Sequence, residues 1–379
     1  MIVLTVNTGS SSVRLAAFAL EGESLLRQAS GHFPGDWNDP AAMLRAFLKG
    51  HGIEAVAAVA HRIVHGGARL TEPCRIDDTV AAEIERLVPL APLHNPRALE
   101  WIHACRAMFG AETAQVAVFD TAFYAALPEV AATYALPRAL SARHGIRRYG
   151  FHGLAHQAMW RRWRELRPDL PAGGRVISLQ LGAGCSVTAV RDGQAVDTSM
   201  GFSPLEGLVM ATRSGDVDPG LLLFLQRAEG LTPDRMERLL NEESGLLGLS
   251  GVSGDMRALL EADDAEARLA VDVYCYRARK YVGAYLAVLG GADAILFGGG
   301  VGEQAPEVRA QIFSGLEGLG IVLDADANRA AIGAEMGISA RGSAVAVWVV
   351  PVDEAVILAQ AALAVTAASE AVGVQEKRS

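Results

Sequence analysis

Apolar residues along the chain group into short runs that end abruptly in glycine, serine and other small residues. Residues 2–6 form one such run, which passes through the small-residue turn 7–12 into a second apolar stretch at 13–18. The same order of run, turn and run recurs at 176–190, about half a chain further on. Each segment predicts a β-hairpin with a tight turn, and the recurrence predicts an internal duplication.

A third segment changes from helical to strand periodicity. Apolar residues recur at helical spacing over 267–289, and a pair of glycines directly after this stretch predicts the end of the helix. The apolar run 294–297 predicts a strand, followed by the glycine-rich loop 298–303 and a helix that opens near Pro306. Backbone N–H groups in such a loop, together with the helix dipole, can hold an anion. The alternation of strands with helices indicates an α/β protein.

Size and charge narrow the function classes. The chain has 379 residues, which favours two domains at about 150 residues each. Its 43 acidic and 34 basic residues give a net charge of −9, which argues against a nucleic-acid partner. The sequence contains no G-x-x-x-x-G-K-[ST] segment, which excludes a P-loop NTPase, and no C-x-x-C pair. It also shows no signal-peptide pattern and no apolar run of ~18 residues, so we expect a cytoplasmic protein without a membrane partner.

Two arginines lie in sequence surroundings where their charge would need an anionic partner. Arg62 lies on an apolar strand pattern that leads into Gly66 and Gly67. Burying an arginine there costs free energy unless an anion compensates it. Arg213 lies in the small polar loop 203–219. Both side chains are therefore candidates for binding an anionic ligand.

Acidic side chains follow two strand patterns. Asp120 ends the apolar run 116–119, and Glu354 follows the apolar run 345–350 just past a proline. Ligands of open α/β sheets bind at the carboxyl ends of strands, which favours catalysis or metal binding at Asp120. A helix N-cap or turn role is the alternative for this residue. His94 is held in a loop between two prolines.

The histidine pairs His61–His65 and His152–His156 have the four-residue spacing of a helical metal pair, but neither stands in an H-E-x-x-H segment.

The candidate residues together favour phosphoryl transfer with Mg²⁺. Such a reaction uses turns that bind anions, arginines, separate acidic residues and neutral histidines, and the chain has all four. The alternative for any single small-residue turn is an ordinary hairpin. These residues do not identify the phosphoryl acceptor.

Eight short motifs between residues 2 and 360 stand in a distinctive order. They occupy residues 7–12, 61–67, 92–96, 119–123, 149–153, 204–207, 212–219 and 300–303. In this order they resemble the acetate/propionate kinase family, which belongs to the superfamily of sugar kinases, Hsp70 and actin. The resemblance covers essentially the whole chain.

The resemblance implies a reversible transfer of the γ-phosphoryl group of ATP to acetate or propionate, giving an acyl phosphate and ADP by direct in-line transfer. It implies Mg²⁺, or Mn²⁺, as the metal and a homodimer as the assembly. It also implies an α/β fold of two duplicated ribonuclease H-like domains of the actin/Hsp70 type with a cleft between them. Residues 1–121 with 356–379 would form the N-terminal domain, and residues 122–355 the C-terminal nucleotide-binding domain.

The resemblance also implies roles for individual residues. Catalysis would fall to Arg62, Asp120, His152 and Arg213. The acid would be bound by Arg62, Val64, Leu93, His94, Phe151 and Pro204. The phosphates and the nucleotide would be bound by Asn7, Ser10, Ser12, Arg14, Gln180, Gly182, Gly184, Asp255, Arg257, Gly300, Gly302 and Glu303. The metal would be held at Asn7 and Glu354. Arginines make chemical sense here because a carboxylate and an anionic phosphoryl group repel each other.

Five positions depart from the family pattern, and two of them, Leu154 and Ala155, replace hydroxyl residues that are usual after the His-Gly pair. Arg14 stands where the family usually has lysine, and Gln180 and Ala183 stand where it usually has histidine and asparagine. Glutamine can donate a hydrogen bond but cannot become cationic. We therefore expect an altered donor side, with slower turnover of ATP or another donor such as pyrophosphate. A non-catalytic nucleotide-dependent switch and an acyl-phosphate hydrolase are the alternatives from other function classes.

Overall fold

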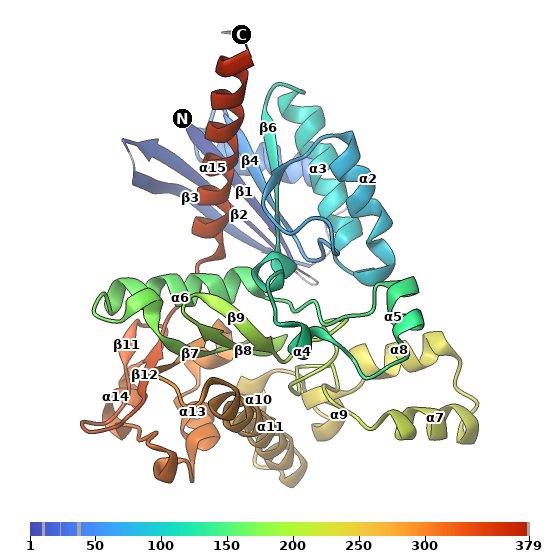
Figure 1. The fold of residues 1–379 in the computed structure, drawn as a ribbon, viewed down its shortest axis with the longest axis vertical. Coiled ribbons are helices and arrows are strands. Elements are labelled where there is room, and N and C mark those ends of the chain that lie inside the picture. The colour runs from blue at the N-terminus through green and yellow to red at the C-terminus, as the bar shows by residue number, and fades with distance from the viewer. Residues whose placement is uncertain (10–11, 23, 36–38, 377–379) are drawn as a thin grey trace. The chain divides into compact units, whose positions relative to one another are not determined.

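The computed structural model describes residues 1–9, 12–22, 24–35 and 39–376, with side chains of the last helix described as far as Ala368. The chain divides into two compact units. Unit 1 comprises Met1–Ala125 and Asp353–Ser379, and unit 2 comprises Ala126–Val352. Each unit is built around one six-stranded mixed sheet flanked by helices (Figure 1). The prediction of an α/β protein with two sheet domains is therefore confirmed.

The sheet of unit 1 has the order β3-β2-β1-β4-β6-β5. Its strands are β1 (Ile2–Thr8), β2 (Ser12–Glu21), β3 (Ser24–Pro34), β4 (Ala58–Ile63), β5 (Cys74–Arg75) and β6 (Ala114–Phe119). Its helices are α1 (Pro40–Gly50), α2 (Asp78–Arg86), η1 (Val88–Leu90), α3 (Asn95–Phe109), η2 (Asp120–Tyr124) and α15 (Glu354–Glu376). Helices α1 and α3 bury Leu44, Phe47 and Trp101 against Leu4 and Val6 of β1. Helix α15 packs on β1, β4 and β6, as Figure 1 shows.

The sheet of unit 2 has the order β11-β12-β10-β7-β8-β9. Its strands are β7 (Arg175–Leu181), β8 (Cys185–Arg191), β9 (Gln194–Thr198), β10 (Ala294–Gly298), β11 (Met336–Gly337) and β12 (Ala346–Val349). Its helices are α4 (Glu129–Ala132), α5 (Arg138–His144), α6 (Gly153–Leu166), η3 (Pro171–Gly173), α7 (Pro219–Ala228), α8 (Pro233–Glu242), α9 (Gly245–Ser250), α10 (Met256–Glu261), α11 (Ala265–Leu289), α12 (Gly299–Gln304), α13 (Pro306–Phe313), η4 (Glu317–Leu319) and α14 (Ala325–Ala330).

The two sheets share one topology. In unit 1, β1 pairs antiparallel with β2 and parallel with β4, which pairs parallel with β6, and β5 adds an antiparallel edge. In unit 2, β7 pairs antiparallel with β8 and parallel with β10, which pairs parallel with β12, and β11 adds the antiparallel edge. Each strand of the first sheet therefore has its counterpart six strands later in the chain. This correspondence confirms the duplication that the two hairpins predict.

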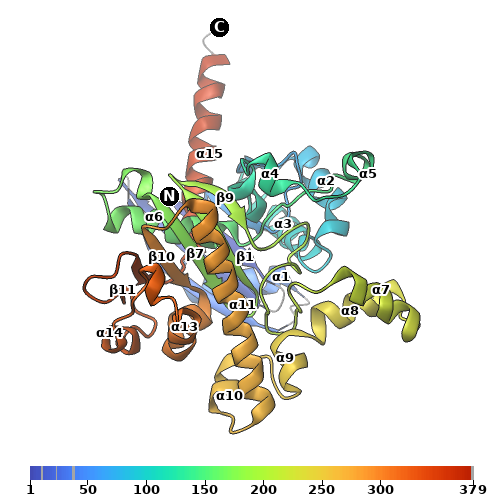
Figure 2. The same cartoon turned by 60° about the horizontal axis from the view of Figure 1, so that its bottom comes forward.

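The long helix predicted over 267–289 is α11, which begins two residues earlier. The Asp264 carboxylate caps it by accepting a hydrogen bond from the backbone N–H of Ala267 at 2.9 Å. Gly290, with a φ of 70°, ends it in the left-handed conformation that glycine favours. Figure 2 shows α11 running beside α9, α10 and α13 of unit 2, which pack against it.

The prediction of a glycine-rich loop over 298–303 is wrong. Gly298 is the last residue of β10, and the helix α12 begins at Gly299. Glycines disfavour a helix, but two downstream side chains hold this one in place. The Glu303 carboxylate accepts from the N–H of Gly299 at 2.9 Å, and Arg309 donates to the carbonyl of Gly302 at 2.8 Å. The first N–H group that could have faced an anion is therefore already bonded to Glu303.

Three buried histidines with lowered pKa values should make the free energy of unfolding depend on pH. Burial lowers the pKa of His61 to about 4, against a smaller opposing effect of its hydrogen bond to Gln115. Burial also lowers the pKa of His65 to about 4 and that of His156 to about 3. In the unfolded chain these imidazoles keep a pKa of ~6.5 and take up protons first as the pH falls. The free energy of unfolding therefore falls from about pH 6.5 downward.

We expect the urea midpoint at about pH 5.5 to lie clearly below that at about pH 7.5, because each such histidine contributes up to ~1.4 kcal/mol per pH unit in this range. Urea titrations followed by circular dichroism measure the shift. The exposed His103 gives a control, since His103→Gln should leave the pH dependence unchanged. Equal midpoints at the two pH values would contradict the buried, neutral state of these histidines.

Within the described ranges, none of the helices combines the length and the apolar character that crossing a bilayer needs.

Candidate active site

A buried ion pair lies at the carboxyl ends of two parallel strands in the unit 1 sheet. Strands β4 and β6 run parallel, with Arg62 opposite Val118, so Arg62 and Asp120 come together at their carboxyl ends. Arg62 donates from Nε to Oδ1 of Asp120 at 3.1 Å and from Nη2 to Oδ2 at 2.6 Å. The Asp120 side chain is fully buried and that of Arg62 is 11% exposed. The resemblance implies a site role for each residue, but the sequence does not show that they pair.

Two further polar side chains join this pair. Strand β1 lies beside β4, and Arg62 donates from Nη1 to Oδ1 of Asn7 and to the carbonyl of Thr8, both at 3.3 Å. Asn7 in turn donates from Nδ2 to Oε2 of Glu354 at 2.5 Å. Burial disfavours the charged guanidinium, but the carboxylates of Asp120 and Glu354 outweigh it and raise the pKa of Arg62. Arg62, Asp120, Asn7 and Glu354, which we call the unit 1 cluster, hold one positive and two negative charges.

This donor set suits a magnesium ion that is bound mainly by phosphates. Mg²⁺ usually takes one or two carboxylates from the protein and completes its shell with water and phosphate oxygens. Both oxygens of Asp120 accept from Arg62, and the amide oxygen of Asn7 accepts a longer hydrogen bond from it at 3.3 Å. Glu354 would therefore be the first oxygen ligand here, and Asn7 a second one once it releases Arg62. Across the described residues, no three His, Cys, Asp or Glu side chains gather as a preformed metal cage. The cluster therefore fits a metal that arrives with a phosphate-bearing substrate.

Unit 2 carries a second group of polar residues at the start of α6. His152 precedes the helix with a φ of 57°, a left-handed conformation that is strained for a residue other than glycine. Its Nδ1 lies 2.9 Å from Oγ of Ser186 on β8. His152 and His156 do not share a helix face, because His152 stands outside the helix, which agrees with the argument against a metal pair at these positions. The ring nitrogens of His156 instead contact Ser178 and Ser186.

Arg213 lies beside His152 at the β7–β8 turn. A Cβ placed on Gly184 would come within 3.1 Å of Nη2 of Arg213 and within 3.3 Å of Nε2 of His152. A larger residue at this turn would therefore crowd both side chains, and glycine leaves them room. Arg213 donates from Nη1 to the carbonyl of Pro204 at 2.6 Å. Burial lowers its pKa, with a smaller opposing effect of Cys185, and no carboxylate in the described part of the chain forms an ion pair with it.

Gln180 lies close to this group at the end of β7. It is opposite Gly298 of the parallel strand β10, and its Nε2 would be 2.9 Å from a Cβ on Gly299. Its Oε1 is buried and has no hydrogen-bond partner among the described residues. An unsatisfied buried acceptor costs free energy, which is typical of sites that a ligand completes. Gly182, Gly300, Gly302 and Glu303 lie at the same ends of β7 and β10 or in α12.

The remaining predicted residues have varied surroundings. In unit 1, Val64 is buried, Leu93 is 52% exposed and His94 is the N-cap residue of α3. Ser12 begins β2, Arg14 is exposed on β2, and Ser10 lies outside the described residues. In unit 2, Phe151 is buried, and Asp255 caps α10 while pairing with the exposed Arg257 at 2.6 Å. Arg62 and Arg213 therefore belong to different units.

Sequence reasoning missed the serines that contact the histidines. Ser178 and Ser186 are fully buried in strands whose other residues are mostly apolar. A hydroxyl group in a buried strand needs a hydrogen-bond partner, and that requirement is the signal that could have found them.

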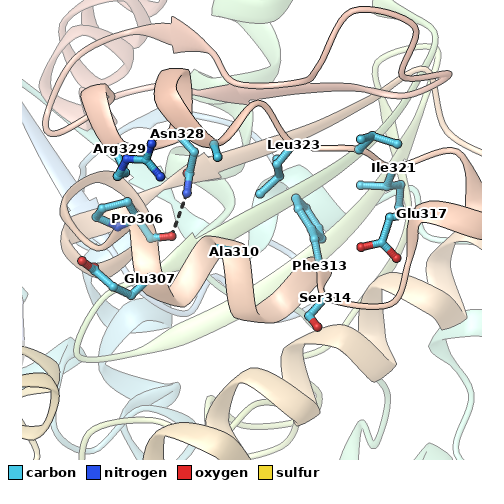
Figure 3. A pocket seen from close by; sticks show the side chains of 12 residues that line it. Pro306, Glu307, Ala310, Phe313, Ser314, Glu317, Ile321, Leu323, Asn328 and Arg329 are labelled. Carbon is cyan, nitrogen blue, oxygen red and sulfur yellow. Dashed lines mark hydrogen bonds between the residues drawn. The ribbon is translucent and has the colours of Figure 1, made fainter.

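A separate pocket of about 370 Å³ lies between α13 and α14 (Figure 3). Phe313, Ile321 and Leu323 give it an apolar wall, with Glu307 and Arg329 among its other lining residues. Asn328 donates from Nδ2 to the carbonyl of Pro306 at 2.8 Å and holds its two sides together. None of the predicted site residues lines this pocket.

Comparisons with known proteins agree on one family. The sequence model of the Acetokinase family matches residues 40–360. The chain is 51% identical over 309 residues to the acetate kinase of Solibacter usitatus, covering 80% of this chain and 75% of that one. It is 44% identical over 389 residues to the acetate kinase of Streptomyces avermitilis, covering 94% and 96%.

Solved structures give the same result. Porphyromonas gingivalis acetate kinase aligns with a TM-score of 0.87 at 38% identity, covering 96% of this chain and 99% of that one. A propionate kinase from Francisella tularensis aligns with a TM-score of 0.87 at 34% identity, covering 95% and 98%.

Proposed function

The chain belongs to the acetokinase family and is an ATP-dependent carboxylate kinase, and we propose that it phosphorylates acetate or propionate by direct in-line transfer. The observation that carries this proposal is the state of Arg213, a buried cation beside His152 without an ion-pair partner among the described residues. A buried, unpaired charge is costly unless a ligand of opposite charge completes it. A migrating phosphoryl group supplies that charge.

In the proposed reaction, a carboxylate oxygen of the acid attacks the γ-phosphorus of ATP. The bond from this phosphorus to the β–γ bridging oxygen breaks, its electron pair stays with ADP, and an acyl phosphate forms. Catalysis of such a transfer consists of positioning the reactants and stabilising charge. Arg213 and His152 would face the phosphoryl oxygens, and Arg62, fixed by Asp120, would face the acid.

We also propose Mg²⁺ at the unit 1 cluster, held by Glu354 and Asn7 together with the phosphates. When bound, the metal neutralises phosphate charge. The protein's own part is to keep Glu354 in place, which the hydrogen bond from Asn7 supports.

The length of the acid is set weakly. Val64 and Phe151 are buried apolar side chains, and we propose that they meet the alkyl end of the acid. One methylene group in such a pocket changes binding by only ~1–3 kcal/mol. Acetate and propionate should therefore both be accepted.

Trapping of the acyl phosphate as its hydroxamate tests the proposed function. We expect product with ATP, Mg²⁺ and acetate or propionate, and much less with longer acids. The same assay with GTP or pyrophosphate in place of ATP tests whether the departures at Gln180 and Ala183 change the choice of phosphoryl donor. Phosphate release without any acid would identify a hydrolase, and tight binding of ATP without hydroxamate would identify a non-catalytic switch.

Gln180→Ala should lower kcat with ATP by about 100- to 1000-fold, because removal of one preorganised donor costs ~2.7–4 kcal/mol of transition-state stabilisation. The KM for the acid should stay the same, since Gln180 lies on the phosphate side in this proposal. Steady-state kinetics measure both constants. The exposed Gln194 on β9 is the matched control, and Gln194→Ala should leave them unchanged. A kcat within twofold of the parent would remove Gln180 from the site.

We further propose a cytoplasmic homodimer. All four cysteines are free thiols, as is usual in a reducing compartment. Helix α7 exposes Leu221, Leu223 and Phe224, which a second subunit could cover. Sedimentation equilibrium of the protein and of Phe224→Glu tests this assembly, and a monomeric parent protein would contradict it.

A further inference from the structure

Four side chains of unit 2 form a continuous chain of hydrogen bonds. Oγ of Ser178 lies 2.5 Å from Nδ1 of His156, whose Nε2 lies 2.8 Å from Oγ of Ser186. The same oxygen of Ser186 lies 2.9 Å from Nδ1 of His152. Ser178, His156 and Ser186 are fully buried. We call these three residues the buried relay.

The protonation of His156 limits how the relay can be arranged. Burial lowers the pKa of His156 to about 3, so its ring is neutral at neutral pH and carries a single N–H. One ring nitrogen therefore donates and the other accepts. Each serine hydroxyl can donate one hydrogen. The hydrogen bonds must then run through the relay in a consistent direction.

Only one arrangement of donors and acceptors gives every polar hydrogen of the relay an acceptor. If His156 donated from Nδ1 to Ser178, the hydroxyl hydrogen of Ser178 would have no acceptor among the described residues. If Ser186 accepted from both histidines, its own hydrogen would be left over in the same way. When Ser178 donates to Nδ1 of His156, His156 donates from Nε2 to Ser186, and Ser186 donates to Nδ1 of His152. Every buried hydrogen of the relay then has an acceptor.

We infer that the buried relay fixes His152 in its neutral Nε2–H tautomer, so that it presents an N–H donor at the Gly184 turn. This inference deepens the proposed function and rests on it for the identity of the bonded group, a phosphoryl oxygen. Ser178, His156 and Ser186 are then positioning residues that act through His152. With Nδ1 accepting from Ser186, the one hydrogen of the neutral His152 ring is on Nε2. His152 can therefore donate a hydrogen bond without taking up a second proton.

Two structural details support this assignment. The backbone N–H of His156 donates to the carbonyl of His152 at 3.0 Å, which ties the strained residue to the first turn of α6. The ring edge with Nε2 faces Gly184, where the absence of a side chain leaves space. Arg213 from the 203–219 loop and Cys185 on β8 are ionisable groups of the described residues at this turn.

Nitrogen NMR of protein labelled in its histidines tests the inference without any activity. At a pH about 1.5 units above the ordinary histidine pKa of ~6.5, we expect the His152 ring to show a protonated Nε2 and a bare, hydrogen-bonded Nδ1. His152→Gln identifies its signals. In Ser186→Ala the donor to Nδ1 is gone, and the pattern should shift towards a mixture of tautomers. A protonated Nδ1 on His152 in the parent protein would overturn the inference.

Kinetics connect the tautomer with the reaction. Ser186→Ala should lower kcat for hydroxamate formation by ~10–100-fold, as is typical when the partner that orients a functional histidine is removed, with the KM for the acid unchanged. Ser199→Ala is the matched control, because Ser199 is a buried serine that accepts from the N–H of Val187 outside the relay. It should change neither kcat nor the NMR pattern.

The two measurements separate the two possible failures. Absence of acyl phosphate from the parent protein would refute the proposed function, whereas the tautomer is read from the spectrum alone. If the parent shows the Nε2–H tautomer and Ser186→Ala keeps full kcat, the relay does not position His152 for the reaction.

Discussion

Arg213→Gln is expected to remove nearly all turnover and yet leave the protein as stable as before, or more stable. Arg213 is buried and has no ion-pair partner among the described residues, so its charge costs free energy until a substrate binds. Glutamine can still donate to the carbonyl of Pro204, which is the hydrogen bond that Arg213 makes. The amide cannot neutralise a phosphoryl group. We expect kcat to fall at least 1000-fold, beyond the ~100–1000-fold loss of one neutral donor.

Steady-state kinetics and thermal unfolding of the same preparations measure the two effects. The exposed Arg235 pairs with Glu243 at 2.7 Å and gives the control, since Arg235→Gln should leave kcat unchanged. A loss of stability in Arg213→Gln of several kcal/mol would show that the arginine has a structural role. Near-normal turnover of Arg213→Gln would contradict the proposed role of Arg213 in binding the phosphoryl group.

Arg62→Gln is expected to lose both activity and stability. The bidentate pair with Asp120 is buried, and removing one partner of such a pair costs ~3–5 kcal/mol, because the remaining charge loses its compensation. Turnover should also fall at least 1000-fold, since the acid would lose its cation. Arg62→Lys should not rescue either property, because an ammonium group cannot span both carboxylate oxygens.

The double variant Arg62→Gln/Asp120→Asn separates the two losses. Without either charge, most of the free energy of unfolding should return, while kcat stays low. A double-mutant cycle of urea unfolding gives the coupling between the two residues, which we expect to exceed the ~0.2–1 kcal/mol typical of exposed pairs. If the single and double variants are equally unstable, the pair does not explain the stability of this edge of the sheet.

Local patterns were sufficient for the architecture. The hairpins at 2–18 and 176–190 follow from apolar runs with small-residue turns, and their recurrence revealed the duplicated topology that the two sheets share. Asp120 could be placed because strand ends are readable from apolar runs. Its partner could not, because Arg62 is 58 residues away and only the parallel pairing of β4 with β6 brings the two together.

Tertiary contacts explain the predictions that were wrong or incomplete. The pattern of segment 298–303 predicts a loop, but its greater part is a helix, in which Gly299 donates to the Glu303 carboxylate and Arg309 donates to the carbonyl of Gly302. The spacing of His152 and His156 suggests a shared helix face, but His152 stands before the helix in a left-handed conformation. No pattern in the sequence reports a backbone angle of that kind for a histidine. The serines of the relay were missed although a hydroxyl group in a buried strand needs a hydrogen-bond partner and so carries a signal.

The hydrogen bond between Asn7 and Glu354 joins the first strand to the first residue of the last helix, across 347 positions of sequence. Helix α15 packs on β1, β4 and β6, so the nascent polypeptide cannot finish unit 1 while its last 23-residue helix is still inside the ribosome. Unit 2 is continuous in sequence and can fold during translation, whereas the sheet of unit 1 must wait until α15, which follows unit 2 in the sequence, has been made.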